Sequence, residues 1–210
     1  NDSRFWKSFL NNVIIVLYQI GGQVGIAFIF LLLITSPRTI YREAHRTALF
    51  VPVVMSAVVV GFLWSIVYDQ RSGLLNGFIR LFAGADFTKT WLGNPDTILF
   101  FVSVPIMWQF IGLYLAIFMA SYASIPREIF EMTHIEGAGN IRTTLYITIP
   151  LMWDTVRIAV MLCIAGNMKI FDHIYVLTGG GPGNASSVLA MYAYEVAFRM
   201  YRIEYAAAIS

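Results

Sequence analysis

The residues best suited to chemistry stand in one polar interval, EIFEMTHIEGAGN, which interrupts two strongly apolar blocks. It offers carboxylates at Glu128, Glu131 and Glu136 and an imidazole at His134. His134 and Glu136 do not make a metal pair, because no second histidine is nearby to complete a ligand set. No nucleophile is paired with a base anywhere in the sequence. We therefore expect no catalytic residue and no metal site, and the chemistry expected of this interval is binding.

Two further motifs receive their simplest interpretation. The run TGGGPGN is rich in glycine, but no Lys-Ser or Lys-Thr follows it, so it is not a phosphate-binding loop and reads as an external turn. Cys163 is the only cysteine, which excludes an internal disulfide and predicts a small apolar core residue. The sequence contains no basic run, so we expect no nucleic-acid partner.

The elements that must position this interval are membrane helices. The 210 residues are 58% hydrophobic and 12% charged, whereas a soluble domain carries roughly 25% charged residues. Residues 8–37, 47–68 and 97–123 contain no charged side chain at all. A bilayer core about 30 Å thick requires about 20 apolar residues in a helix. The sequence therefore predicts an all-α, polytopic helical membrane protein.

The expected organisation is a single membrane domain, residues 1–210, with a polar loop at 123–149 inside it. The chain opens without an initiator methionine and stops inside YAAAIS. We therefore expect an excerpt that lacks the first and last membrane helices. Helices are expected at residues 9–34, 48–68, 97–122, 151–177 and 187–200. A polar connection at 69–96 is expected to join the second of these helices to the third.

The polar loop itself has the pattern of two short helices. Pro126 suits a helix start, and Glu128 and Glu131 favour the first turns of a helix because its dipole is positive there. Gly137 is typical of a helix C-terminal cap. Asn140 is expected to cap a second helix at 141–146, and the chain returns to the membrane after that helix.

Apolar residues on the first of these helices indicate a docking surface. Ile129 and Met132 are three apart and share a helix face. An ordinary solvated loop has no need of Ile129, Phe130 and Met132, whereas exposed apolar residues rimmed by charge are typical of a protein interface.

These residues carry a family resemblance. EMTHIEGAGNIRTTLYITIP resembles the cytoplasmic loop of permease subunits of bacterial ABC importers, which reads Glu-Ala-Ala, three residues, Gly, nine residues, Ile-x-Leu-Pro. Glu131, Gly137 and Pro150 fall at that spacing, and Ile147 does too. Met132 and Thr133 replace the two alanines, and Ile149 replaces the leucine. These departures suggest altered packing against the partner. RFWKSFLNNV, GLLNGF, WLGNPD, FDHIYVLTGGGPGNAS and EYAAAIS resemble other parts of carbohydrate-uptake permeases, of the type of the larger maltose-permease subunit and the glycerol-phosphate permease.

The resemblance implies a fold, a set of partners and a topology. The fold would be that of the type I importer transmembrane domain, in the bacterial cytoplasmic membrane. A second permease subunit, forming a heterodimer, and two cytoplasmic ATPase subunits would complete the transporter. The ATPases would bind ATP and Mg, so no cofactor is expected in this chain. An extracytoplasmic solute-binding protein would deliver a sugar or sugar derivative. Residues 123–149 would be cytoplasmic, and 70–95 and 179–186 extracytoplasmic.

The resemblance also assigns roles to residues. The coupling loop would enter a cleft of an ATPase, whose closure on ATP switches the path from inward-facing to outward-facing. Glu131 would pair with a basic residue of the ATPase, and Gly137 would allow the tight turn. The residues expected to contribute to coupling are Glu131, Gly137, Ala138, Ile129, Met132 and Pro150.

A substrate path is expected on the third and fourth long helices. Cys163, Asn167 and Ile170 lie at i, i+4 and i+7, on one helix face. By resemblance they match positions of the maltose permease's sugar cavity. Three residues of the preceding helix match or adjoin such positions: Trp108, Gln109 and Leu113. Amides suit sugar hydroxyls and an aromatic face suits a sugar ring. The alternative for all six is helix–helix packing and hydrogen bonding.

Charges within the fourth helix have an open role. A charge at mid-membrane costs roughly 2.5–3.5 kcal/mol, so Lys169 and Asp172, three apart, are expected to pair or to face water. Asp172 matches the family's Phe-Asp and is interpreted as structural, whereas the resemblance assigns nothing to Lys169.

Other functional classes fit less well. A secondary transporter would show internal repeats with interrupted helices and no docking loop. An intramembrane enzyme would need His-Glu-x-x-His or paired aspartates, which the sequence lacks. An ABC permease for an amino acid, a polyamine or a phosphonate is the narrower alternative. The sugar itself cannot be named from these residues.

Overall fold

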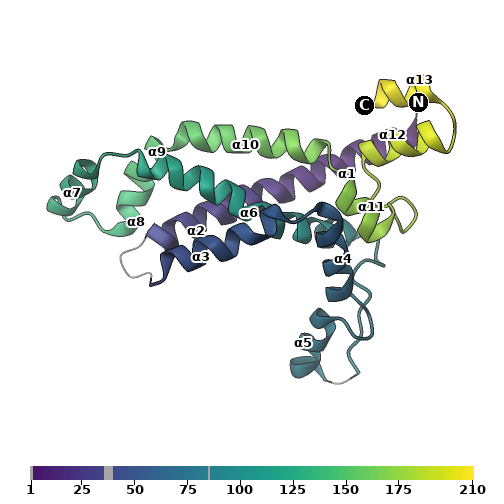
Figure 1. Cartoon of the computed structure of the whole chain (residues 1–210), viewed down its shortest axis with the longest axis horizontal. Coiled ribbons are helices and arrows are strands. Elements are labelled where there is room, and N and C mark those ends of the chain that lie inside the picture. Colours follow the sequence, from purple (N-terminus) through teal and green to yellow (C-terminus); the bar gives the residue numbers. More distant parts are fainter. Residues whose placement is uncertain (1, 36–39, 85) are drawn as a thin grey trace. The chain divides into compact units, whose positions relative to one another are not determined.

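The computed structural model describes residues 2–35, 40–84 and 86–210, and within these ranges the chain forms helices and no strand. Figure 1 labels its helices along the chain. The chain divides into two compact units. Unit 1 comprises Asn1–Gln19, Met55–Gln109 and Ala165–Ser210, and unit 2 comprises Ile20–Val54 and Phe110–Ile164. The all-α prediction is confirmed.

Two continuous helical spans in the described residues are long and apolar enough to cross a membrane. The first runs through α1 (Ser3–Gln19), a π-helical turn (Ile20–Gly25) and α2 (Ile26–Thr35), and the second is α6 (Ile98–Ala123). The number rises to four if two bent pairs are each counted as one span. One pair comprises α3 (Arg42–Phe50) with a 3₁₀ turn (Val51–Val54), and α4 (Ala57–Val67). The other pairs Thr144–Leu151 with α10 (Trp153–Met168).

The predicted second and fourth helices are thus wrong in one respect, because each is interrupted. The second changes from α to 3₁₀ geometry at Val51 and leaves helical geometry around Ser56, whose side chain caps α4. The fourth is broken at 169–171, between α10 and α11 (Asp172–Thr178). The last helix predicted is confirmed as α12 (Leu189–Phe198), and α13 (Ile203–Ile209) follows it.

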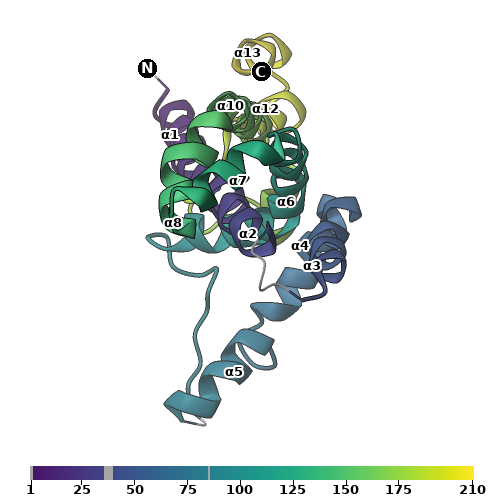
Figure 2. The same ribbon diagram turned by 90° about the vertical axis from the view of Figure 1, so that its left-hand side faces the viewer.

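Unit 2 has a core formed by α2, the second half of α6 and α10. Leu31, Phe118 and Cys163 are fully buried in it, and the Phe28 and Phe118 rings meet edge to face at 5.4 Å. Figure 2 views this unit from the end that carries α7 and α8. The expectation that Cys163 is a buried core residue is confirmed.

A glycine sets the packing of α3 against α6 in unit 2. A Cβ atom at Gly112 would lie 2.2 Å from the carbonyl oxygen of Leu49 and 2.9 Å from the Cα of Phe50. Both are backbone atoms, so they cannot turn away as a side chain can. Small residues allow helix backbones to approach closely in a membrane.

Unit 1 is held together by buried amide side chains. Asn11 Nδ2 donates to the carbonyls of Ala185 (3.0 Å) and Ser187 (2.8 Å). Asn12 Nδ2 donates to the carbonyls of Asn167 (3.2 Å) and Met168 (3.3 Å), where α10 ends. Its Oδ1 accepts from the Leu189 amide (2.8 Å), the first residue of α12. Asn12 therefore satisfies the end of one helix and the start of another.

The N-terminal residues of unit 1 are tied to α12 and α13 through a carboxylate. Asp2 Oδ2 accepts from the hydroxyls of Tyr192 (2.5 Å) and Tyr205 (2.6 Å), and these bonds to the charged form lower the pKa of Asp2 to about 2. Arg4 pairs with Glu195 at 2.6 Å. These contacts fix the start of α1 beside the last two helices.

The segment between α4 and α6 is not the purely polar connection that the sequence predicts. It contains α5 (Leu74–Ala83), a helix with Leu81 and Phe82 strongly exposed. Gly73 stands at the N-cap of this helix, and Asn76 bonds its polar side to the loop that follows.

We expect Gly112→Ala to destabilise the protein by about 1–3 kcal/mol, the range for overpacking, because α3 must move away from α6. Gly166→Ala is the control: an added Cβ at Gly166 in α10 meets nothing within 4 Å, so the helix-favouring alanine should leave stability unchanged or slightly higher. The thermal midpoint of the purified protein in detergent measures both. Equal midpoints for the two variants would contradict the close approach of α3 to α6.

Candidate functional site

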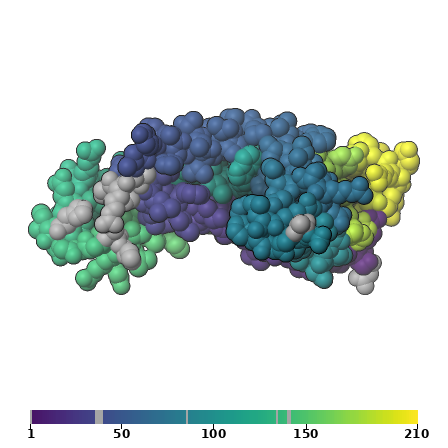
Figure 3. Space-filling view, turned by 90° about the horizontal axis from the view of Figure 1, so that it is seen from below, coloured from purple at the N-terminus to yellow at the C-terminus, as the bar shows by residue number. Residues whose placement is uncertain are grey.

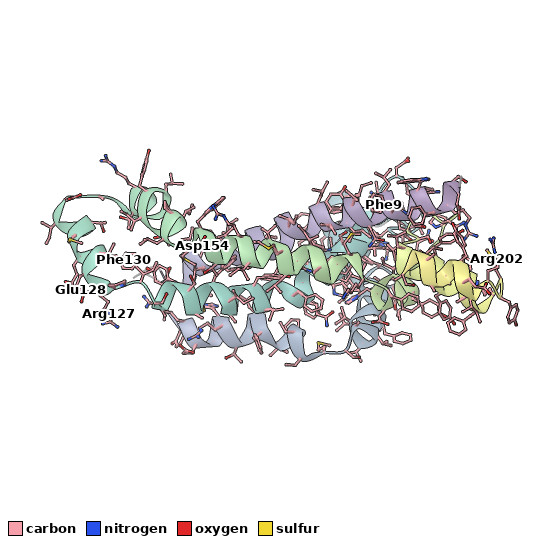
Figure 4. The ribbon with its side chains drawn as sticks, turned by 90° about the horizontal axis from the view of Figure 1, so that it is seen from above. Phe9, Arg127, Glu128, Phe130, Asp154 and Arg202 are labelled. Carbon is pink, nitrogen blue, oxygen red and sulfur yellow. The ribbon has the colours of Figure 1, made fainter. Side chains whose placement is uncertain are left out.

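The polar loop of unit 2 forms a short helix, α7 (Arg127–Ile135). Phe130 is half-buried and its ring lies 5.3 Å from that of Tyr122, near the end of α6. Figure 4 shows Phe130 on the side of α7 nearer the other helices, with Arg127 pointing away. Thr133 is buried and its hydroxyl donates to the Phe130 carbonyl at 2.7 Å. One face of α7 is thus anchored to the unit.

The opposite face of α7 presents apolar and acidic side chains together. Met132 is 56% exposed and Ile135 is 85% exposed. Glu128 and Glu131 are also exposed, whereas Ile129 is half-buried. Met132 is exposed as predicted, whereas Ile129 and Phe130, which the sequence predicts to be exposed with it, are half-buried. The sequence interpretation missed Ile135, although its spacing of three from Met132 places it on the same side.

The end of α7 is a glycine cap. Gly137 has a φ of 72°, in the left-handed region, and the Ala138 amide donates to the Thr133 carbonyl at 2.9 Å. This is the bond across the cap that closes a Schellman motif. The prediction that Gly137 ends the helix is confirmed, and Ala138 takes part through its backbone.

The return to the membrane differs in detail from the prediction. The second short helix, α8 (Asn140–Thr143), includes Asn140 as a helical residue instead of a cap, and the Thr143 amide donates to the carbonyl of Gly139. A π-helical segment (Thr144–Thr148) and α9 (Ile149–Leu151) follow. Pro150 lies within α9, and the chain bends by 62° before α10. The side chains of His134, Asn140 and Ile141 lie outside the described residues.

In unit 1, the proposed substrate-path residue Gln109 is engaged within the chain. Its Nε2 donates to the carbonyl of Met55 (2.8 Å), and its Oε1 lies 2.5 Å from Nε2 of the buried His173. Trp108 is 36% exposed and its ring meets that of Trp64 at 6.1 Å. His173, which the sequence interpretation did not single out, is thus the partner that fixes Gln109.

The remaining substrate-path residues fall in both units. Asn167 and Ile170 of unit 1 are buried, the first in the last turn of α10 and the second at the break that follows it. In unit 2, Cys163 is fully buried with its Sγ 3.5 Å from Gln23 Oε1, whereas Leu113 is 38% exposed. The predicted substrate-path residues are thus divided between the two units.

Within the described ranges, charged and metal-ligating side chains form no further candidate site. The ion pairs found there join Arg4 to Glu195, Arg46 to Glu43 and Arg157 to Asp154. Lys169 and Asp172 are both exposed, at and beside the break between α10 and α11, and form no ion pair with each other. Of the two predicted arrangements, pairing or exposure, the structure therefore has exposure. No three His, Cys, Asp or Glu side chains of the described residues gather closely enough to hold a metal ion.

Comparison with known proteins decides the family. The probable ABC transporter permease protein YurN of Bacillus subtilis is 32% identical over the whole chain, which covers 72% of that protein. The chain belongs to the ABC transporter permease family. No protein-family model matches the sequence. As a member of the ABC transporter permease family, this chain is a membrane transport component.

Two other relatives carry a substrate in their names. The diacetylchitobiose uptake system permease NgcF of Streptomyces coelicolor is 32% identical over 79% of this permease and 47% of its own length. The lactose transport system permease LacF of Rhizobium radiobacter is 27% identical over the whole chain and 71% of its own length.

The fold is shared with a solved importer. A bacterial ABC transporter that imports the acidic polysaccharide alginate matches with a TM-score of 0.88 at 19% identity, over all of this permease and 73% of that chain. The predicted fold class, a helical ABC importer transmembrane domain, is confirmed.

We expect Gly137→Ala to destabilise the end of α7 by about 1–2 kcal/mol, because an L-residue with a Cβ is disfavoured in the left-handed region. Gly137→Asn should cost less, since asparagine tolerates that region. Gly139→Ala is the control: an added Cβ at Gly139 meets nothing within 4 Å, and its φ lies outside the left-handed region. The rate of limited proteolysis in the loop measures the effect. Equal cleavage rates in the alanine variants would refute the cap.

Proposed function

We propose that this permease translocates a sugar, an oligosaccharide or a sugar derivative, driven by a separate ATPase that binds the loop at 123–149. The relatives named for diacetylchitobiose and lactose support a carbohydrate substrate. Solutes such as amino acids, polyamines and phosphonates are the alternative that a substrate panel would reveal.

The observation that carries the coupling proposal is the outer face of α7. Met132 and Ile135 are mostly exposed beside the Glu128 and Glu131 carboxylates, on a helix whose other face is anchored through Phe130. Apolar groups at the centre of a surface with charged groups around it are the arrangement of a protein interface. A short, rigidly held helix transmits a displacement of its partner to the helices behind it.

The proposed mechanism assigns each coupling residue a task. Glu131 pairs with a basic residue of the ATPase, and Met132 with Ile135 fills an apolar part of its cleft. Ile129 supports the helix from its half-buried side. The turn at Gly137 and Ala138 allows α7 to stand outward, and Pro150 lies where the chain bends back toward α10.

The proposed assembly is a heterodimer with a second permease, two ATPase subunits that bind ATP and Mg, and an extracytoplasmic solute-binding protein. We propose a bacterial cytoplasmic membrane, with 123–149 on the cytoplasmic side and 70–95 and 179–186 outside. The family's nature as a transport component supports this arrangement.

We propose, on the family resemblance, that Trp108, Asn167 and Ile170 of unit 1 contribute to the substrate path. Leu113 and Cys163 of unit 2 are proposed to contribute to it as well. Gln109 is proposed as a positioning residue, because both ends of its amide are already engaged, by Met55 and His173. It would hold the Trp108 segment of α6 in place while other groups contact the sugar.

We expect Glu131→Lys to abolish coupling, because reversing a charge at an interface leaves the partner's cation facing another cation. Breaking such a pair costs roughly 2–5 kcal/mol. The affinity of the permease for the ATPase should therefore fall by more than tenfold. The control is Glu204→Lys, the same charge reversal at an exposed acid of α13. Co-purification of the ATPase and substrate-stimulated ATP hydrolysis measure the effect. Normal stimulation in the Glu131 variant would refute the coupling role.

We further expect a mono- or oligosaccharide to stimulate ATP hydrolysis by the reconstituted complex together with its solute-binding protein, whereas amino acids, polyamines and phosphonates should not. Measuring hydrolysis in proteoliposomes against that panel tests the substrate class. Stimulation by a non-sugar solute alone would overturn the sugar proposal but leave the permease assignment intact. Absence of any co-purifying ATPase would overturn the coupling proposal.

A further inference from the structure

The amphipathic helix α5 of unit 1 has its polar side turned inward. Asn76 is fully buried, and its Nδ2 donates to the carbonyls of Lys89 (2.9 Å) and Gln70 (3.0 Å), while its Oδ1 accepts from Trp91 Nε1 (3.1 Å). Arg80 donates to the carbonyls of Phe87 (2.9 Å) and Arg71 (3.0 Å). The polar groups of α5 are therefore satisfied by its own flanking loops.

The apolar side of α5 faces outward instead. Leu74 is 70% exposed, Phe78 62%, Leu81 77% and Phe82 80%. Figure 3 shows this segment, in teal, as the surface nearest the viewer. A contiguous outward apolar face of this kind is unfavourable in water and indicates contact with an apolar medium or partner.

An apolar groove continues this face onto the neighbouring helices. Its volume is about 420 Å³, and its walls include Trp64 and Tyr68 at the end of α4, Leu74 and Phe78 of α5, and Phe101 and Val104 of α6. The surface of the groove is almost wholly apolar. Phe62 and Ile66 of α4 are themselves 62% and 66% exposed, so α4 also carries exposed apolar side chains.

Aromatic side chains place α5 at the boundary of the membrane. Four rings form a chain of contacts in which each neighbouring pair of centroids is at most 6.0 Å apart: Trp64, Tyr68, Phe101 and Trp91. Lys89 Nζ lies 4.7 Å from the centroid of the Trp91 ring. Trp and Tyr gather at the headgroup level of bilayers. A tight turn leads from α4 to α5. In this turn Asp69 Oδ1 accepts a hydrogen bond from the Ser72 amide (2.7 Å), and this bond lowers the pKa of Asp69. The turn is too short for α5 to leave that level.

We propose that α5 is an interfacial lipid-binding helix, lying in the plane of the membrane surface with its apolar face in the acyl boundary and a phospholipid acyl chain in the adjoining groove. A second permease subunit is the less suitable occupant. A protein interface has a polar rim, whereas the charged and amide groups of α5 are turned inward. The proposal rests on membrane residence alone and does not depend on the sugar or on the ATPase.

Spin labels test the orientation of α5 in the assembled transporter, reconstituted in phospholipid vesicles. Leu81→Cys and Phe82→Cys carry the label on the apolar face, and Asp86→Cys carries it on an exposed polar position as the matched control. Cys163 is buried, so the parent protein gives the labelling background. We expect labels at 81 and 82 to collide more with oxygen than with a water-soluble nickel chelate, and the label at 86 to show the reverse. Preference for the chelate at 81 and 82 would overturn the proposal.

A photo-reactive amino acid in place of Phe78 identifies the occupant of the groove. We expect a phospholipid adduct on illumination, detected as the mass of the cross-linked subunit. A cross-link to a second polypeptide would instead establish a subunit interface and overturn the proposal. If the spin labels at 81 and 82 were accessible neither to oxygen nor to the nickel chelate, that result would likewise indicate a subunit interface. Neither result bears on substrate stimulation of ATP hydrolysis, so failure here is distinguishable from failure of the proposed function.

Discussion

Backbone groups freed inside a membrane must find partners within the protein, because lipid offers none, and unit 1 depends on this constraint. Its helices are interrupted near Met55 and again after Met168, and each interruption leaves carbonyls without helical partners. Gln109 donates to the carbonyl of Met55, and Asn12 donates to those of Asn167 and Met168. The irregular helices are therefore stable only together with the buried amides of other segments.

The same constraint explains what could be predicted from the sequence. Stretches of 20 or more residues without a charge predict membrane helices, because a single charge at depth costs several kcal/mol. They do not predict where such a helix breaks, since the partner of a freed carbonyl is far away in sequence. Asn12, for example, acts on residues more than 150 positions later. The helix at 151–177 was accordingly expected to be continuous, and the segment 69–96 to be merely polar.

The polar loop at 123–149 is more predictable because its signals are local. Gly137 ends α7 in a backbone conformation that glycine favours, and the acids near Pro126 mark the start of the helix. The exposed side of α7 was harder to predict. Phe130 is drawn inward by Tyr122 of α6, and this contact decides that Met132 and Ile135 face outward. Sequence spacing gives the faces of a helix but does not give the direction in which each face points.

Two outward apolar surfaces of this permease differ in what surrounds them, and the difference indicates different partners. On α7, Met132 and Ile135 stand among carboxylates, and the desolvation of those charges favours a partner that supplies matching cations. On α5, Leu81 and Phe82 have no charged neighbour on the same face, because Arg80 is held by backbone carbonyls on the other side. A surface without polar groups gains nothing from a protein partner that lipid tails do not also provide. Under the two proposals made for α7 and α5, the direction of the Arg80 side chain therefore distinguishes a protein-docking helix from a membrane-surface helix.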